Sequence, residues 1–441
     1  MPDTNRRDFI KDASVGLVGA AALSAVAADE SQAADDKDRF VIGLIGPGGM
    51  GTNHLKHLVT YPDVQVAYVC DPDAERLAAA AKIVESATGK TPKAVKDMRE
   101  VLDDKSVVAV FIATPDHWHA PAAILACDAG KHVYVEKPCS HNIREGRLII
   151  DAAQRNNRVV QVGTQSRSSE HVVKAVELLR SGAIGDILSA KVWNSQRRRD
   201  IGHAQPSAPP TNLDYDLWLG PAPMRPYQAN LLPGIWRWWH EFGCGDMGND
   251  GVHNIDIACW GLGVDTHPSA IAALGGKYFF NDDQQFPDTQ TVIFEYPGDG
   301  QVGHRKQLIF EQRIWSPYRQ EGYENGNAFY GTKGLLVMGH TVGWQCFGER
   351  NKLIAEMTGT PNLPAHHRNF FDVIRGQAKP NAPAEVGHLA ASLCHLGNLA
   401  TRFGRTLKFD PAAEQIVGDA EAAPLVRRQY RADHWATPKA V

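Results

Sequence analysis

Apolar positions in the first third of the chain come in short runs, and longer stretches with helical spacing lie between them. The strand-like runs cover residues 40–45, 64–69, 107–112, 132–135 and 159–162, and the helix-like stretches cover residues 51–59, 73–87, 120–129 and 143–155. Such alternation is typical of parallel strands joined by crossover helices. We therefore predict an α/β domain built on a doubly wound parallel sheet.

The pattern changes after about residue 163. Longer strand-like segments, with fewer helices between them, cover residues 187–197, 268–280, 290–296 and 302–314. This favours a second α/β domain with a largely antiparallel sheet. The Pro-rich segment 204–210 predicts a surface loop. Near the end, a helix packed against the body is predicted by the helical spacing of Leu389, Leu393, Leu396 and Ala400.

Length and composition limit the class of protein. With 441 residues, of which 43% are hydrophobic, the chain is long enough for two or three domains with sizeable cores. Its 46 basic and 50 acidic residues give a formal net charge of −4, which implies no nucleic-acid surface. The seven cysteines have no paired spacing, and no HExxH or CxxC motif occurs. We therefore expect small core thiols and no metal site.

The first 33 residues have the features of an export signal. The pair Arg6-Arg7 precedes an Ala/Gly-rich apolar run from Ala13 to Ala28, and small residues suited to cleavage occur at 25–27 and 31–33. The paired arginines resemble the twin-arginine signal, and the run is too short and too rich in alanine for a membrane span. We predict a periplasmic or otherwise exported protein, with no membrane insertion after processing. The alternative is a disordered extension of a cytoplasmic enzyme.

A glycine-rich turn follows directly behind the first strand-like run. Its sequence is Gly46-Pro47-Gly48-Gly49-Met50-Gly51, and Asp71 follows twenty residues after the last glycine, at the end of the next apolar run. In a dinucleotide site the first glycine permits a tight turn, the second lets the backbone approach the pyrophosphate, and the third lets the next helix pack close. The pyrophosphate then lies at the helix N-terminus. An ordinary glycine turn is the alternative, but it does not account for the acid in register.

The acid at position 71 bears on the choice of cofactor. Asp71 favours NAD over NADP, because its carboxylate can accept hydrogen bonds from an adenosine ribose hydroxyl and would repel a 2′-phosphate. Arg76, a few residues along, leaves NADP open. Free NAD is scarce outside the cytoplasm, and the twin-arginine route carries folded proteins. We therefore expect the cofactor to be loaded before export and held tightly.

Two further segments lie at the ends of predicted strands. Residues 113–119 follow the third apolar run, and Tyr134-Val135-Glu136-Lys137-Pro138 ends the fourth. Ligands bind at the carboxyl ends of the strands in such sheets. A lysine at this edge can stabilise a hydroxyl that is losing its proton. Taken alone, a lysine at the end of a strand such as Lys137 is more often a solvated charge.

Together these motifs resemble the Gfo/Idh/MocA family, the family of glucose-fructose oxidoreductase and inositol dehydrogenase. The resemblance covers roughly residues 39 to 410, through the glycine turn, Thr114-Pro115-x-x-x-His119, Glu136-Lys137-Pro138, the segment 243–256 and Gly331-Thr332-Lys333-Gly334. It implies an NAD(P)-binding Rossmann domain over residues 39–162 and a substrate and oligomerisation domain over residues 163–441 with an open, largely antiparallel sheet. It also implies a homo-oligomer that transfers hydride to or from a sugar or cyclitol in a pocket between the domains.

The resemblance also implies roles for individual residues. Lys137 positions and polarises the reacting hydroxyl, and His253 is the general acid/base, a role that suits an imidazole because its ordinary pKa is about 6.5. Without the motif, His253 would be interpreted as a core histidine. The expected cofactor contacts are Gly46, Gly48, Gly49, Met50, Gly51, Asp71, Thr114, Pro115, His119, Glu136 and Lys137.

One position departs from the family pattern. The family commonly has Asp four residues before this histidine, whereas this chain has Asn249 there and acids at Asp246 and Asp250. An amide can bind a substrate hydroxyl but cannot take a proton. We expect Asn249 to bind substrate, and it stays open whether His253 acts alone or with one of the two acids.

The segment 235–240, Ile-Trp-Arg-Trp-Trp-His, combines flat apolar faces with a guanidinium group. Aromatic faces stack on sugar rings, and an arginine can donate hydrogen bonds to hydroxyls. We therefore predict Arg237 and Trp238 as substrate contacts. For any one tryptophan of this segment, a core or oligomer contact is an equal alternative.

Three functions are compatible with these features. The first is an exported oxidoreductase acting on a sugar, glycoside or cyclitol. The second is a glycosidase that uses retained NAD transiently, oxidising a ring carbon, eliminating the aglycone and returning the hydride. The third is a nucleotide-binding scaffold without chemistry. Net oxidation separates the first from the second, and substitution of Lys137 tests the third.

Overall fold

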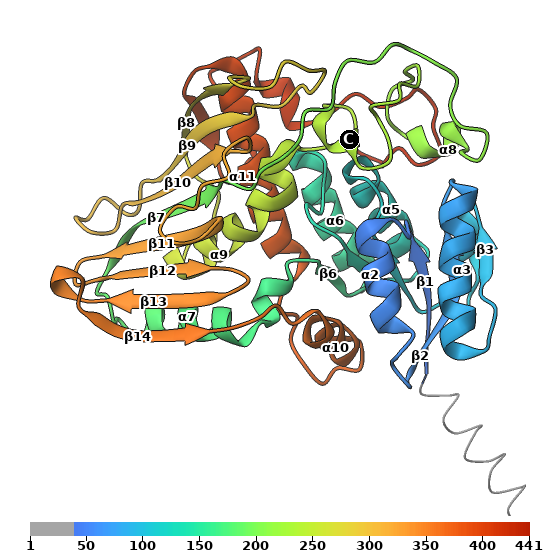
Figure 1. The fold of residues 1–441 in the computed structure, drawn as a ribbon, viewed down its shortest axis with the longest axis horizontal. Helices are drawn as coiled ribbons and strands as arrows, with labels where there is room; N and C mark the ends of the chain where they lie inside the picture. Colours follow the sequence, from blue (N-terminus) through green and yellow to red (C-terminus); the bar gives the residue numbers. More distant parts are fainter. Residues whose placement is uncertain (1–38) are drawn as a thin grey trace, which may run out of the picture.

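Two β-sheets, each covered by helices, form the molecule (Figure 1). The computed structural model describes residues 39–441, so the export signal expected at residues 1–33 lies outside the described part. In Figure 1 the first sheet and its helices are blue to teal, and most of the second sheet is green to orange. Among residues 39–441, no helix combines the length and apolar character needed to cross a membrane.

The first sheet has six strands, all parallel, in the order β3-β2-β1-β4-β5-β6. The strands are β1 (Phe40–Ile45), β2 (Val64–Cys70), β3 (Lys93–Val95), β4 (Ala109–Ile112), β5 (His132–Val135) and β6 (Val160–Val162). The predicted doubly wound parallel sheet is confirmed. Strand order reverses between β1 and β4, and the crevice beside their carboxyl ends is where such sheets bind ligands.

Five helices connect these strands: α2 (Gly49–Leu58), α3 (Ala74–Thr88), α4 (Met98–Asp103), α5 (Asp116–Asp128) and α6 (Ile143–Asn156). Helix α5 begins four residues before the predicted stretch at 120 because Pro115, with φ −59° and ψ 154°, already takes the extended conformation that precedes a helix. His117 and His119 therefore lie in the first turn of α5 and not in a loop.

The second sheet has ten strands in the order β14-β13-β12-β11-β7-β10-β9-β8-β15-β16. They are β7 (Ile187–Asn194), β8 (Ala270–Gly276), β9 (Thr289–Tyr296), β10 (Lys306–Arg313), β11 (Asn325–Gly331), β12 (Leu335–Gly339), β13 (Gly343–Phe347), β14 (Leu353–Thr358), β15 (Leu407–Asp410) and β16 (Gln415–Val417). Only β7 and β10 pair in parallel, which confirms the largely antiparallel sheet.

Helices α7 (Glu170–Arg180), α9 (Val252–Leu262) and α11 (Ala384–Phe403) pack on one face of this sheet. The predicted C-terminal helix is α11, whose Leu393, Leu396 and Ala400 are buried in the same core as Phe294 and Phe310 of the sheet. The segment 204–210 is an exposed loop apart from one isolated bridge at Pro206, as predicted.

Later parts of the chain also return to the first domain. Helix α10 (Leu363–Ile374) buries Phe370 and Phe371 against Phe40 and Phe111 of the first sheet. Near the C-terminus, Ala436 is buried in the core on the other side of that sheet. A separate aromatic cluster around helix α8 (Tyr215–Leu219) and the 3-10 helix η2 (Ile235–Trp238) lies over the carboxyl ends of its strands.

Candidate active site

A cavity of about 1020 Å³ lies between the carboxyl ends of the first sheet and the segments around η2 and the start of α9. Most of the predicted site residues line it, namely Gly46, Gly48, Gly49, Met50, Asp71, Thr114, Pro115, His119, Glu136, Lys137, Arg237, Asn249 and His253. Gly51 and Trp238 are the two predicted residues outside this lining set. The sequence motifs of both halves thus meet in one concave site, of the kind that binds small molecules and cofactors.

The glycine turn packs too tightly for side chains. Gly46 has φ +85°, and a Cβ there would lie 2.7 Å from the backbone nitrogen of Thr114. A Cβ on Gly51 would lie 2.1 Å from the carbonyl oxygen of Gly46, so Gly51 acts through packing of α2 on the turn. The N-terminus of α2, beginning behind Gly48, has no side-chain cap. Its free N–H groups at the cavity suit a pyrophosphate.

Asp71, which directly follows β2, is buried and accepts a hydrogen bond from the backbone N–H of Asp73 at 2.9 Å. Burial raises the pKa of the Asp71 carboxyl to about 6. The Arg76 guanidinium lies beside the glycine turn, 2.8 Å from where a Cβ on Gly48 would be. The acid and the arginine therefore line the same end of the cavity.

The segment after β4 contains a hydroxyl without a partner, on Thr114, and a histidine, His119, that contacts two loops. Thr114 Oγ1 is buried without a hydrogen-bond partner, which suits a contact with a bound polar group. His119 Nδ1 lies 2.7 Å from the carbonyl oxygen of Pro138, and its Nε2 lies 2.9 Å from that of Thr114. Both ring nitrogens are thus engaged in holding the loops after β4 and β5 together.

Glu136 is held by a buried chain of hydrogen bonds. Its Oε1 accepts from Gln165 Nε2 at 2.8 Å and lies 2.9 Å from His54 Nε2. His54 Nδ1 lies 2.8 Å from His367 Nε2, and the other nitrogen of His367 lies 3.2 Å from the hydroxyl of Tyr61. Burial by itself would raise the pKa of Glu136, but the His54 hydrogen bond and nearby positive charge bring it below its usual value. An anionic carboxylate therefore sits next to Lys137 in the chain.

Lys137 and His253 face the same cavity from different domains. Lys137 Nζ donates a 2.6 Å hydrogen bond to the carbonyl oxygen of Asn249, within the π-helix η3 (Met247–Gly251) that leads into α9. His253 lies in the first turn of α9 and stacks on His340, with ring centroids 5.6 Å apart. Burial, with the charge of Lys137, lowers the pKa of His253 well below its ordinary value. The imidazole is therefore uncharged at neutral pH and can accept a proton.

The two acids left open by the sequence lie in different surroundings. Asp246 is buried, accepts hydrogen bonds from Asn194, Arg198 and Asn249, and does not line the cavity. Asp250 lines the cavity and forms an ion pair with Arg198. Burial raises the pKa of Asp246. Of the two acids, only Asp250 is at the surface that a substrate would meet.

The aromatic segment divides between the cavity and the core. Trp236 and Arg237 line the cavity, and Arg237 Nε is buried without a partner. Trp238 is 5% exposed and belongs to the aromatic core cluster with Trp218. The structure therefore brings Trp236 to the cavity in place of the predicted Trp238.

The cavity residues that were not predicted from the sequence include Asp116, Trp118, Met98 and Trp435. Asp116 is buried, and burial raises the pKa of its carboxyl although Lys137 and Arg237 act in the opposite direction. For Asp116 and Trp118, the proximity to the Thr114 motif was the available signal. Met98 and Trp435 come from α4 and the C-terminal segment, where no motif points to a site.

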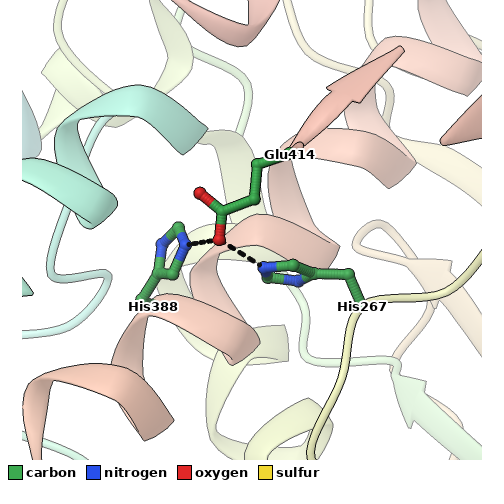
Figure 2. Close-up of side chains that lie close together, drawn as sticks. All are labelled: His267, His388 and Glu414. Atoms are coloured by element: carbon green, nitrogen blue, oxygen red, sulfur yellow. Dashed lines mark hydrogen bonds and ion pairs between the residues drawn. The ribbon is translucent and has the colours of Figure 1, made fainter. Parts of the chain in front are cut away.

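A second cluster of polar side chains lies away from the cavity (Figure 2). His267 Nε2 and His388 Nε2 lie 3.2 and 2.9 Å from Glu414 Oε1, from three separate segments of the second domain. These atoms have the types of a metal site, but the guanidinium of Arg147, from α6, also binds both carboxylate oxygens. We interpret the cluster as an ion-paired junction between the domains, since Arg147 already neutralises the carboxylate. All seven cysteines are free and buried, as expected.

Comparison with known proteins agrees with this geometry. The family model for the oxidoreductase family's NAD-binding Rossmann fold, Gfo/Idh/MocA, matches residues 40–164. The model for the same family's C-terminal α/β domain matches residues 191–300 and 326–437.

Individual relatives are more distant. A glycosyl hydrolase family 109 protein of Shewanella pealeana is 28% identical over 204 residues, which cover 42% of this chain and 44% of that protein. Inositol 2-dehydrogenase of Salmonella typhimurium is 34% identical over 150 residues, which cover 33% of this chain and 43% of that enzyme. The matches thus span less than half the length of either relative.

Among solved structures, the WlbA dehydrogenase from Bordetella pertussis in complex with NADH and UDP-GlcNAcA superposes with a TM-score of 0.63 at 20% identity. The match covers 84% of this chain and 99% of that one, and it supports the two-domain fold. With both domain models matched and the glycine turn, Lys137 and His253 on one cavity, the chain belongs to the Gfo/Idh/MocA oxidoreductase family, with that family's NAD-binding Rossmann domain.

Proposed function

We propose that the protein is an NAD-dependent oxidoreductase that transfers hydride between nicotinamide and a hydroxyl-bearing carbon of a sugar, glycoside or cyclitol. The observation that carries the proposal is the cavity itself. The Lys137 ammonium group, hydrogen-bonded to the Asn249 carbonyl oxygen, and the uncharged His253 imidazole line the same cavity as the glycine turn expected to bind a dinucleotide. The tight packing at Gly46 and Gly51 and the unpaired Thr114 hydroxyl fit the cofactor.

Lys137 and His253 have complementary roles in this proposal. Bound NAD supplies a ring that accepts hydride from the substrate carbon. Lys137 Nζ, held by the Asn249 carbonyl, binds the substrate oxygen and stabilises the negative charge that develops there. His253 removes the hydroxyl proton; because its Nδ1 is enclosed without a partner, we assign this step to Nε2. Asp250, at the cavity wall, lies three residues before this histidine in the chain.

The polar lining supports a polyhydroxylated substrate. Arg237 and Asn249 offer hydrogen-bond donors, and Trp236 offers an aromatic face that suits the C–H face of a sugar ring. The name of the inositol 2-dehydrogenase relative points to the same chemical class.

A glycosidase that uses NAD transiently is the second candidate. The match to a glycosyl hydrolase family 109 protein supports it. The same two side chains serve both reactions, because oxidation of a ring carbon also begins with loss of a hydroxyl proton. The two candidates differ in products, since the glycosidase releases a sugar without net change in the redox state of NAD.

The proposal includes export, a retained cofactor and a homo-oligomer. Arg6-Arg7 and the apolar run behind them support export by the twin-arginine route. Retention follows from the scarcity of free NAD outside the cytoplasm. Exposed apolar side chains at and beyond β8, Leu274, Tyr278 and Phe279, offer a surface for a second subunit.

The test is the fluorescence of reduced nicotinamide in the purified mature protein, without added cofactor, during titration with sugars, glycosides and inositols. We expect a change with particular sugars, which is lost in Lys137→Ala and His253→Ala and kept in Lys352→Ala, an exposed lysine outside the cavity. Release of an aglycone without accumulated NADH would favour the glycosidase. An unaffected reaction in Lys137→Ala would overturn the proposed mechanism.

A further inference from the structure

The C-terminal segment, residues 427–441, runs along α5 and α6 of the first domain (Figure 1), and its Trp435 lines the cavity. We call it the C-terminal strap. At its start Arg428 donates to Glu145 Oε1 at 2.8 Å and to the carbonyl oxygen of His117 at 2.7 Å, and the Tyr430 hydroxyl donates to the same Glu145 oxygen at 2.7 Å. Glu145 is fully buried, so these hydrogen bonds are shielded from water.

The strap is anchored at its far end as well. Ala436 is fully buried in the core of the first domain, and Arg144 of α6 donates to the carbonyl oxygen of Ala440 at 2.8 Å. Trp435 lies between the two sets of anchors. Its position is therefore fixed by the fold and is not that of a free chain end.

Trp435 lines the cavity. The guanidinium carbon of Arg99 lies 4.5 Å from the centroid of its ring, and the ring of Trp118 lies 5.8 Å away at 42°. Contacts with a cation and a second indole hold the ring in one orientation. Met98, beside Arg99 at the start of α4, lines the same part of the wall.

The strand pairing in the first sheet indicates that this part of the cavity is where the adenosine half of a dinucleotide would lie. β3 pairs with β2 so that Val95 lies opposite Cys70, and the Asp71 N–H donates to the carbonyl oxygen of Val95 at 3.2 Å. Residues 96–98, which follow β3 directly, all line the cavity next to Asp71. A dinucleotide whose pyrophosphate meets the glycine turn and whose ribose meets Asp71 carries its adenine towards these residues.

We propose that Trp435 is the surface on which the adenine ring stacks, and that the C-terminal strap thereby closes the adenosine end of the cofactor site. The inference rests on the NAD site of the proposed function and extends it to a residue far away in sequence. Stacking on a fixed aromatic ring strengthens binding because the ring loses little freedom when adenine arrives. Closure by an anchored strap also slows release of the nucleotide.

The test uses full-length mature protein stripped of nucleotide, with ADP as the probe and nicotinamide mononucleotide as the matched ligand without adenine. In Trp435→Ala we expect ADP affinity to fall about 5- to 150-fold, the range that stacking of a base on an aromatic ring supports. Trp435→Phe should stay within about 3-fold of wild type, because a phenyl ring still stacks. Nicotinamide mononucleotide should bind all three proteins equally.

Two further measurements keep the test decisive. The NAD released on acid denaturation of the protein as purified should fall in Trp435→Ala relative to Trp435→Phe. ADP should quench tryptophan fluorescence of wild type more than that of Trp435→Phe, a variant that keeps an aromatic ring at this position if Trp435→Ala does not fold. Equal ADP affinity in folded Trp435→Ala, or equal quenching in wild type and Trp435→Phe, would overturn the inference. Failure of wild type to bind ADP would instead overturn the nucleotide site.

Discussion

Replacing Lys137 with methionine removes its charge while keeping most of its length. In the structure Nζ makes one hydrogen bond, to the carbonyl oxygen of Asn249 at the cavity wall. Loss of that bond costs about 1 kcal/mol of folding free energy, a value typical of a single hydrogen bond. We therefore expect Lys137→Met to fold and to bind nucleotide through the intact glycine turn.

The effect on catalysis is expected to be much larger. Removing one preorganised donor from a developing oxyanion lowers kcat by about 10²- to 10³-fold, equivalent to about 3–4 kcal/mol of transition-state stabilisation. The pKa of His253 should also rise, because burial, the charge of Lys137 and the neighbouring His340 all lower it and the variant removes the charge of Lys137. Since His253 must be uncharged to accept the proton, the acid-side loss of rate moves to higher pH.

The assay is steady-state NADH formation against pH for wild type, Lys137→Met and the exposed control Lys352→Met, with ADP affinity measured in parallel. In Lys137→Met, and not in Lys352→Met, we expect a large loss of kcat and an acid limb of the pH profile at higher pH. ADP affinity should be unchanged in both variants. A loss below about 5-fold, with an unchanged pH profile, would refute the role given to Lys137.

Three other predictions follow from the site. The pKa of the Asp71 carboxyl is raised to about 6, so NAD affinity should fall as pH drops through 6 and the carboxylate is protonated. Titration calorimetry should find no such pH dependence in Asp71→Asn. Gly51→Ala should destabilise the fold by about 2 kcal/mol or more in urea unfolding, because its Cβ would meet the carbonyl oxygen of Gly46. The control is Gly49→Ala, since no atom lies within 4 Å of a Cβ at that position. Equal stabilities of the two variants would contradict the packing argument. His54→Ala should cost about 3 kcal/mol or more by the same method, because it removes two buried hydrogen bonds, leaves His367 Nε2 unpaired and opens a cavity, whereas Lys56→Ala on the exposed face of α2 should be neutral.

The first domain was largely predictable because its strands are continuous apolar runs. β1, β2, β4 and β5 are nearly or fully buried, and central parallel strands must be apolar on both faces. β3 was missed because it is a three-residue edge strand that begins with an exposed lysine. β11 was missed because polar and glycine residues fill half of it.

The candidate site was predictable where local sequence carries the chemistry. The glycine turn and Glu136-Lys137-Pro138 need residues adjacent in the chain, so a motif can report them. In η2, by contrast, a single turn decides which tryptophan faces the cavity, and spacing alone could not choose Trp236 over Trp238. Trp435 reaches the site only because the strap folds back onto α4 and α5, a contact that no local pattern encodes.

Hydride transfer at the cavity is the central claim, and the most direct measurement follows deuterium. A substrate found in the fluorescence titration is prepared with deuterium on its carbinol carbon, and the nicotinamide released from the protein is analysed by mass spectrometry. The account predicts that one deuterium appears in the reduced nicotinamide of wild type and that Lys137→Met transfers it at least about 100-fold more slowly. Substrate turnover with no deuterium in the nicotinamide would contradict the account.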